Sequence, residues 1–358
     1  MANMNTKLPV TRRRFMEAAG VSGIVGLAGC AGGGDGGEGG DSGTTGTAGG
    51  EEGWVPSRNV RVIIPWGAGG GTDTMTRGVM EPAEPMMQEK YGIDVGFTFE
   101  NITGANGLNA AQRVLNNPAD GHILFPSTNS IAPHIATGQA DFTLDDWGYV
   151  ARIQHDTSWL YSSGREGVGW KDINKVVEAA KGGEQIQIGV VGGITGAGFA
   201  VLWANEAGIL ENTRMVTYQD AGRQRTEAIS GEIDMSFGEI QEINEQYKSG
   251  DIALLLVGTR ERLDEYPDVP STGENGWDIY YGLNRGFNVK GGTPQKAIDF
   301  WTDVLKMGYE SDRYQQLEQE TLLYLREGWQ GPDEFRESME GAVEKYKKAV
   351  RLYEEATQ

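Results

Sequence analysis

The sequence predicts an α/β fold for most of the chain, and two observations lead to this prediction. Strand-like and helix-like segments alternate from Val60 onward, and the alternation starts again past Val150. About 300 residues follow position 56, which is enough for one large domain or two of ordinary size. We therefore expect two α/β units built from one continuous chain.

Each element is predicted from its local pattern. Strands are expected where short apolar, β-branched runs end in Gly, Pro or Asp, namely Val60–Pro65, Asp94–Phe99, Ile123–Pro126, Ile186–Val191, Met215–Tyr218, Ile233–Phe237 and Ile252–Val257. Helices are expected over Thr72–Lys90, Leu108–Leu115, Ile173–Ala180, Phe199–Ala207, Gln224–Ser230, Ile240–Ser249 and most of the chain from Thr293 onward. Pro82 and Pro85 are expected to kink or split the first of these helices.

The first residues have the order of an export signal. A twin-arginine pair lies within Arg12–Arg14, a short apolar stretch runs from Ala18 to Leu27, and small residues lead to Cys30. We interpret residues 1–30 as a twin-arginine signal with a lipobox, and residues 31–56 as a disordered, acidic, Gly-rich tether. Cys30 is the only cysteine, so no intramolecular disulfide can form. We expect it to be lipidated and to anchor the protein at the outer face of the membrane, which requires two acyl chains.

The charge balance is strongly acidic. Asp and Glu number 51 against 31 Lys and Arg, which gives a net charge of −20. This excess argues against nucleic acid as a partner. In an exported protein a solvated acidic surface is typical of a high-salt environment, so we expect a halophilic, haloarchaeal source.

The first candidate site is the glycine-rich turn between the first strand and the first helix. Glycines at 69, 70 and 71 allow a ligand to approach the backbone, and the helix that follows begins with free N–H groups of partial positive charge. The candidate ligand groups are Ala68, Gly69, Gly70, Gly71 and Asp73, the last of which can instead cap the helix. A P-loop needs a Lys and a Rossmann fingerprint needs a Gly at Thr72, so both nucleotide motifs fail. A plain strand–helix turn remains an alternative.

A second turn of the same kind follows the strand Ile186–Val191. Its candidate ligand groups are Thr195, Gly196, Ala197 and Gly198, because a ligand between two units needs donors from each. Two independent tight turns are the alternative interpretation. Thr128 and Asn129, after the strand Ile123–Pro126, are candidates for a further wall of the site.

The residues that catalysis would need are scarce. His122, His134 and His155 are scattered without metal-ligand spacing, and no Gly-x-Ser-x-Gly elbow occurs. We therefore predict a binding protein with no metal and no cofactor. An enzyme that uses a nucleotide or phosphate is the less favoured alternative.

These motifs, in this order, resemble the receptor component of tripartite tricarboxylate transporters, the Bug family. The resemblance extends over residues 58–320 and rests on several collinear motifs: Pro65–Asp73 with Arg77, Asn101–Gly107, Pro118–Leu124, Gly193–Gly198, Gly231–Asp234 and Arg260–Ser271. One departure stands at Tyr218–Gly222, where the family's Tyr-Lys-Gly has Gln219 in place of lysine.

The resemblance implies a two-lobed type II periplasmic-binding-protein fold. Residues 57–156 and 282–358 would form the first lobe and residues 157–281 the second. It also implies an extracytoplasmic monomer that captures a small di- or tricarboxylate and passes it to integral-membrane permease subunits. A sensory receptor of the same fold is the alternative. Glu239 is expected to line the cleft, where a carboxylate disfavours an anion and favours a ligand amine or hydroxyl, although a surface helix cap is an equal alternative.

We expect the lobes to close over the ligand. The amides of Ala68–Gly71 would bind one carboxyl group, and Thr195–Gly198 would complete the site, with bridging water. Charge assistance is expected from helix N-termini and not from Lys or Arg.

Overall fold

The computed structural model describes the backbone of residues 53–191 and 194–357. The export signal, Cys30 and residues 31–52 of the tether lie outside the described residues, and so do Gly192 and Gly193. Within the described part, no helix has the length and apolar character needed to cross a membrane.

The first lobe is built on a five-stranded sheet with the order β2-β1-β3-β10-β4. β1 (Val60–Ile64) pairs in parallel with β2 (Phe97–Asn101) and β3 (Ile123–Thr128). β10 (Asn284–Lys290) lies antiparallel between β3 and β4 (Trp147–His155). Its start therefore lies at the carboxyl end of β3, with Arg285 opposite Thr128.

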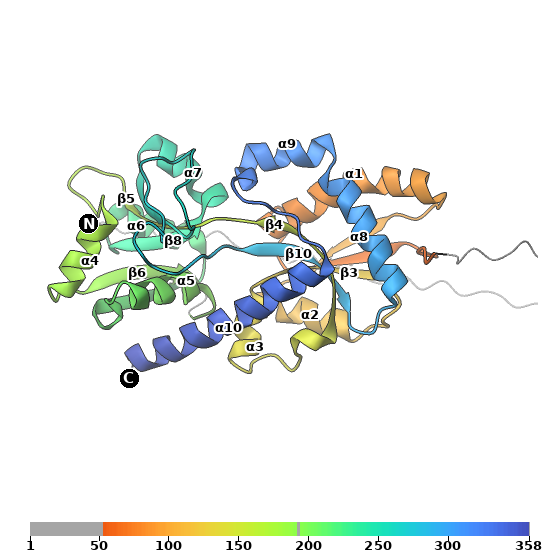
Figure 1. Ribbon diagram of the computed structural model, residues 1–358, viewed down its shortest axis with the longest axis horizontal. Coiled ribbons are helices and arrows are strands. Elements are labelled where there is room, and N and C mark those ends of the chain that lie inside the picture. The colour runs from red at the N-terminus through yellow and green to blue at the C-terminus, as the bar shows by residue number, and fades with distance from the viewer. Residues whose placement is uncertain (1–52, 192–193, 358) are drawn as a thin grey trace, which may run out of the picture. The chain divides into compact units, whose positions relative to one another are not determined.

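Helices cover both faces of this sheet (Figure 1). α1 (Gly71–Tyr91), α8 (Gln295–Tyr309) and α9 (Asp312–Thr321) lie on one face, where Met75, Val79 and Trp301 are buried in a shared core. α2 (Leu108–Leu115) and α3 (Ile131–Ala136) lie on the other, over a core that contains Ile63 and Phe125.

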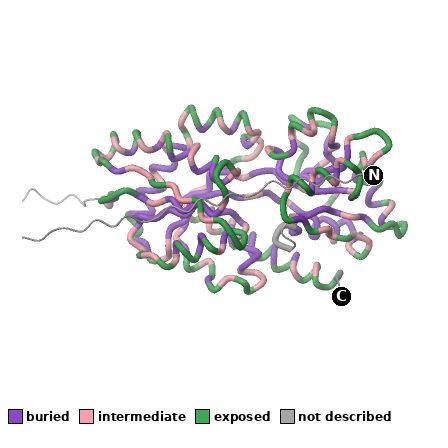
Figure 2. The backbone as a smooth tube through the Cα atoms, turned by 180° about the vertical axis from the view of Figure 1, so that it is seen from behind, coloured by how far each residue is buried: buried purple, intermediate pink, exposed green. Residues whose placement is uncertain are grey.

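The second lobe repeats this architecture with the strand order β7-β6-β8-β5-β9. β6 (Ile186–Val191) is parallel to β7 (Thr213–Tyr218) and β8 (Met235–Glu239), whereas β5 (Ser158–Ser163) is antiparallel to β8 and β9 (Ile252–Val257). The covering helices are α4 (Ile173–Lys181), α5 (Ile194–Glu206), α6 (Ala221–Ser230) and α7 (Ile240–Ser249). Figure 2 shows the buried residues concentrated along the strands of both sheets.

Three segments connect the lobes. The chain passes from β4 to β5 through residues 156–157 and returns from β9 to β10 through residues 258–283. The third is α10 (Pro332–Thr357), which runs past both lobes (Figure 1). Phe335 and Met339 belong to a core of the first lobe, whereas Val343 and Tyr346 belong to the core of the second. The C-terminal helix is thus shared, which differs from its expected assignment to the first lobe alone.

Two other local expectations require correction. α1 continues through Pro82 and Pro85 as one helix and is not split. Pro82 is only partly buried and Pro85 is exposed, so carbonyls that lose their helical partner near these positions can be solvated. The expected strands also omit β4, β5 and β10, in which polar residues interrupt the apolar ones.

Candidate functional site

The first glycine turn forms as expected, and it directs a helix N-terminus at the gap between the lobes. Gly69 has φ 78°, a backbone conformation that favours glycine, and Gly70 is the N-cap of α1. The amide of Thr74 bonds to the carbonyl of Gly70 at 2.9 Å, so the amides of Gly71 and Thr72 lie in the first turn, where N–H groups have no partner within the helix. These amides carry the positive end of the helix dipole.

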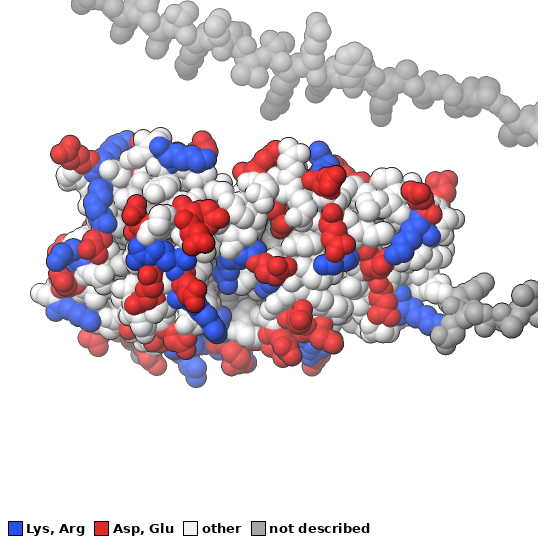
Figure 3. Space-filling model, turned by 45° about the horizontal axis from the view of Figure 1, so that its top comes forward, with Lys and Arg blue, Asp and Glu red and all other residues white. Residues whose placement is uncertain are grey.

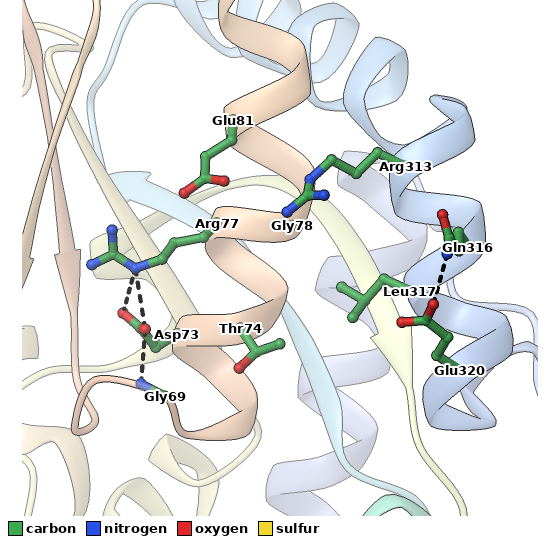
Figure 4. A pocket seen from close by; sticks show the side chains of 10 residues that line it. All are labelled: Gly69, Asp73, Thr74, Arg77, Gly78, Glu81, Arg313, Gln316, Leu317 and Glu320. Atoms are coloured by element: carbon green, nitrogen blue, oxygen red, sulfur yellow. Dashed lines mark hydrogen bonds and ion pairs between the residues drawn. The ribbon is translucent and has the colours of Figure 1, made fainter.

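Asp73 has a different role from the expected one. Its carboxylate accepts bonds from the Gly69 amide at 2.9 Å and from Asn101 Nδ2 at 3.0 Å, and it pairs with Arg77 Nε at 3.1 Å (Figure 4). Burial acts to raise the pKa of Asp73, but these bonds outweigh burial and keep that pKa below its ordinary value. Asp73 therefore stabilises the turn from inside and makes no side-chain cap bond to α1.

A pocket of about 380 Å³ lies between the two sheets, a size within the range of small-molecule sites. It is found where open α/β sheets bind ligands, outside the carboxyl ends of parallel strands. The first lobe contributes Trp66, Gly70, Gly71, Thr128, Asn129 and Arg285. The second contributes Val191, Ala221, Gln224, Phe237, Glu239 and Glu242.

Gly69 and Asp73 do not line this pocket. Both line a separate cavity of about 500 Å³ between α1 and α9, together with Arg77, Arg313 and Glu320 (Figure 4). Ala68 is an exposed residue of the turn and lines neither cavity. Of the candidate ligand groups in the first glycine turn, only Gly70 and Gly71 line the pocket between the sheets. Thr72, which follows them, also lines it.

Thr128 and Asn129 both line the pocket at the end of β3. The Thr128 hydroxyl donates to Ser130 Oγ at 2.5 Å and accepts from the Ser130 amide at 3.1 Å. Asn129 Nδ2 donates to the carbonyl of Gly282 at 3.2 Å, which ties β3 to the segment that returns from the second lobe. Asn129 Oδ1 is buried and has no hydrogen-bond partner among the described residues.

The cation of the pocket is Arg285, a residue that the sequence did not single out. It is 3% exposed, and its Nη1 is 3.4 Å from both Gln154 Oε1 and Asp156 Oδ2. Its Nε has no hydrogen-bond partner within the described residues. The structure thus places an arginine at the pocket, where the sequence led us to expect charge assistance from helix N-termini alone.

Arg285 lies directly against the start of α1. A Cβ placed on Gly71 would be 2.9 Å from Arg285 Nη2, so the missing side chain at position 71 leaves room for the guanidinium. A positive helix end and a guanidinium repel one another unless an anion lies between them. An anion that lies between the two would relieve this repulsion, beyond what the carboxylate of Asp156 already does from the other side of the guanidinium.

The second glycine turn is used differently. For Thr195 and Gly196 only the backbone, in the first turn of α5, is described. Ala197 is fully buried in the core of the second lobe. A Cβ on Gly198 would be 2.8 Å from both Tyr281 and Tyr346, so this glycine permits close packing of α5 against α10. Neither Ala197 nor Gly198 lines the pocket, which corrects their assignment as ligand groups.

Glu239, the last residue of β8, lines the pocket. It is 9% exposed and is the N-cap residue of α7 without a side-chain cap bond. Burial raises the pKa of Glu239 well above its ordinary value, and the neighbouring carboxylates of Glu242 and Asp156 raise it further. Glu242, in the first turn of α7, also lines the pocket. Its side chain is exposed to solvent, although the protein atoms around its carboxylate raise its pKa by desolvation.

No family model matches the chain. A UPF0065 protein of Bordetella bronchiseptica is 26% identical over 249 residues, which are 68% of this chain and 71% of that protein. A UPF0065 protein of Agrobacterium vitis is 26% identical over 232 residues, and the match spans 62% of each chain.

Two solved structures share the fold over most of the chain. A TctC solute-binding protein from Polaromonas, solved without ligand, superposes with a TM-score of 0.69 at 19% identity and covers 83% of this chain and 99% of that one. The MatC protein of Rhodopseudomonas palustris with bound malate superposes with a TM-score of 0.66 at 18% identity and covers 83% and 100%. The two-lobed α/β fold of periplasmic solute-binding proteins, as predicted, is thereby confirmed.

Proposed function

We infer that the chain is a receptor of the Bug family, the binding component of a tripartite tricarboxylate-type transporter, and that it captures a small organic carboxylate outside the cytoplasm. The single observation that carries the inference is the Arg285 guanidinium packed on the first turn of α1. Similarity to UPF0065 proteins, and to a fold that binds malate in MatC, supports the same ligand class.

The chemistry of the pocket favours binding over catalysis. One carboxylate oxygen would accept from the amides of Gly71 and Thr72, and the other from Arg285 Nη2 or Nε. The net charge of −20 for the whole chain does not exclude an anionic ligand, and on the face seen in Figure 3 acidic and basic side chains are interspersed. At about 1 M salt the screening length is about 3 Å, so distant surface charges barely reach the pocket.

Calorimetric titration of the purified protein tests this function. Malate, succinate, citrate, adipate and glutamate are titrated at molar salt, with ATP and inorganic phosphate as controls. We expect at least one of the organic acids to bind with a Kd in the micromolar range or below, and the two controls not to bind. Failure of every organic acid to bind would overturn the proposed function.

The delivery of ligand to permease subunits and the lipid anchor at Cys30 are part of the same proposal. We expect a Cys30→Ser variant, expressed in a host with twin-arginine export, to move from the membrane fraction to the external medium. The Thr11→Ser variant, which keeps the cysteine, serves as the control. Equal membrane association of Cys30→Ser and the parent would contradict lipid anchoring.

A further inference from the structure

The wall of the pocket opposite Arg285 carries two carboxylates that have no cationic partner. Glu239 and Glu242 stand at the N-cap and in the first turn of α7, and both line the pocket. Among the described residues, no Lys or Arg forms an ion pair with either carboxylate, and the Glu239 carboxylate has only its own main-chain amide as donor. Arg225 reaches this turn, but it donates to the carbonyl of Glu242 at 2.6 Å and not to the carboxylate.

The groups of the pocket do not balance in charge. Arg285 is the one cation among the described pocket residues, and it is already 3.4 Å from the buried carboxylate of Asp156. When Glu239 and Glu242 are ionised, their negative charges are therefore in excess. Asn129 Oδ1 is a further acceptor at the pocket without a donor from the described residues.

Helix capping accounts for the exposed Glu242 but not for Glu239. Acidic residues near a helix N-terminus stabilise the helix modestly when they are exposed. Glu239 is nearly buried and makes no side-chain cap bond, and desolvating an unpaired carboxylate is unfavourable. A desolvated, unpaired ionisable group in a cleft is typical of a functional site.

We propose that the ligand is a zwitterion, in which a carboxylate binds Arg285 and the start of α1 while a positively charged nitrogen lies against Glu239 and Glu242. This inference rests on the proposed function and names its ligand class, that of amino acids and betaines. Phe237 and Trp66 also line the pocket, and their rings can contact either an ammonium group or a methylated nitrogen.

The proposal has a consequence for pH dependence. Glu239 is faced by Glu242 from its own helix and by Asp156, which accepts a bond from Gln241 of α7. Arg285 faces it from the first lobe, and Tyr281 of the returning segment and Tyr346 of α10 face it as well. In the empty pocket, burial raises the pKa of Glu239 above its ordinary value, with Glu242 and Asp156 adding to the effect. A cationic group of the ligand lowers the pKa of Glu239. A zwitterion therefore binds more tightly as pH rises through the raised pKa of Glu239, and its binding releases the proton of this carboxyl group. A dicarboxylate binds less tightly over the same interval because the pocket gains negative charge.

Matched ligands test the proposal by calorimetry on the full chain. Glutamate is compared with glutarate, and glycine betaine with 3,3-dimethylbutanoate, its carbon isostere; choline supplies the cation without a carboxylate. We expect one zwitterion to bind about 30-fold or more tightly than its isostere, as for the loss of a buried charge pair. In Glu239→Gln and Glu242→Gln that zwitterion should lose about tenfold or more in affinity while the isostere loses none. Glu245→Gln, an exposed residue of α7, is the matched control.

Each other outcome has a definite meaning. If the dicarboxylates and isosteres bind as tightly as the zwitterions, or the glutamine variants bind zwitterions normally, the zwitterion proposal is overturned and the carboxylate receptor stands. If choline binds as tightly as glycine betaine, no carboxylate is recognised and both proposals fail. If no organic acid of any kind binds, the proposed function fails, and the zwitterion proposal fails with it.

Discussion

Replacement of Arg285 by glutamine is expected to abolish carboxylate binding. The guanidinium is the cation of the pocket, and it lies against the first turn of α1. Truncation of one partner of a buried, hydrogen-bonded charge pair costs about 2–5 kcal/mol, which corresponds to a loss of affinity of about 30-fold to several thousandfold. Calorimetric titration with the best carboxylate ligand measures the loss.

The same substitution is expected to destabilise the fold, because Arg285 is the ion-pair partner of Asp156. The Asp156 side chain is 0% exposed, and burial raises its pKa while Arg285 lowers it. Loss of the guanidinium costs about 3–5 kcal/mol if Asp156 stays ionised. A carboxyl group with a raised pKa stabilises the folded state at low pH and loses this contribution as pH rises. The loss of unfolding free energy caused by Arg285→Gln should therefore become smaller as pH falls and Asp156 becomes protonated.

A second substitution separates binding from stability. In the double variant Asp156→Asn/Arg285→Gln neither charge is buried, so the free energy of unfolding should recover most of its loss while carboxylate binding stays absent. Chemical denaturation at pH 5 and pH 8 provides the stability measurement. Arg285→Lys, which keeps the charge but not the forked donors, should bind with intermediate affinity. Full carboxylate affinity in Arg285→Gln would rule out this account of the site.

The sequence predicted the strands that stand out as apolar, β-branched runs and missed those in which polar residues interrupt the buried apolar ones. The strand Ile252–Val257 was placed at its observed limits because it is a continuous apolar run, and Ile186–Val191 because four of its six residues are Ile or Val. β10 is also buried, but it reads NRGFNVK, and its Asn288 bonds with Ser127 on the neighbouring strand. A one-dimensional pattern of hydrophobicity contains no signal for a strand that is buried through such side-chain bonds.

The same limit applies to the candidate site. Gly70 and Gly71 were found because a glycine turn before a helix is a local feature. Arg285 is more than 200 positions away and reaches that turn only because β10 returns from the second lobe to pair with β3. Glycines also have more than one use, and Gly198 serves helix packing although its turn resembles that of Gly71. An isolated sequence does not distinguish a glycine that gives room to a ligand from one that gives room to a neighbouring helix.

Substitution of Gly71 by valine should therefore remove binding while the fold persists. A Cβ at this position meets only the end of the Arg285 side chain, at 2.9 Å from Nη2 and 3.3 Å from Cζ, and α1 has ordinary helical geometry there. The guanidinium must move away from the α1 amides, so their joint recognition of a carboxylate is lost. We expect at least a hundredfold loss of carboxylate affinity, about 2.8 kcal/mol. The loss of unfolding free energy should be smaller than in Arg285→Gln, because the charge that pairs with Asp156 is retained.

Gly67→Ala is the control for this prediction, since it lies in the same turn and a Cβ there meets nothing within 4 Å. It should bind as the parent does. The comparison separates two explanations of the glycine-rich turn. If the turn needs glycines only to bend, Gly67→Ala and Gly71→Val should both leave carboxylate affinity near that of the parent. If position 71 is glycine so that Arg285 can lie on the start of α1, only Gly71→Val loses carboxylate affinity, and Gly67→Ala keeps it.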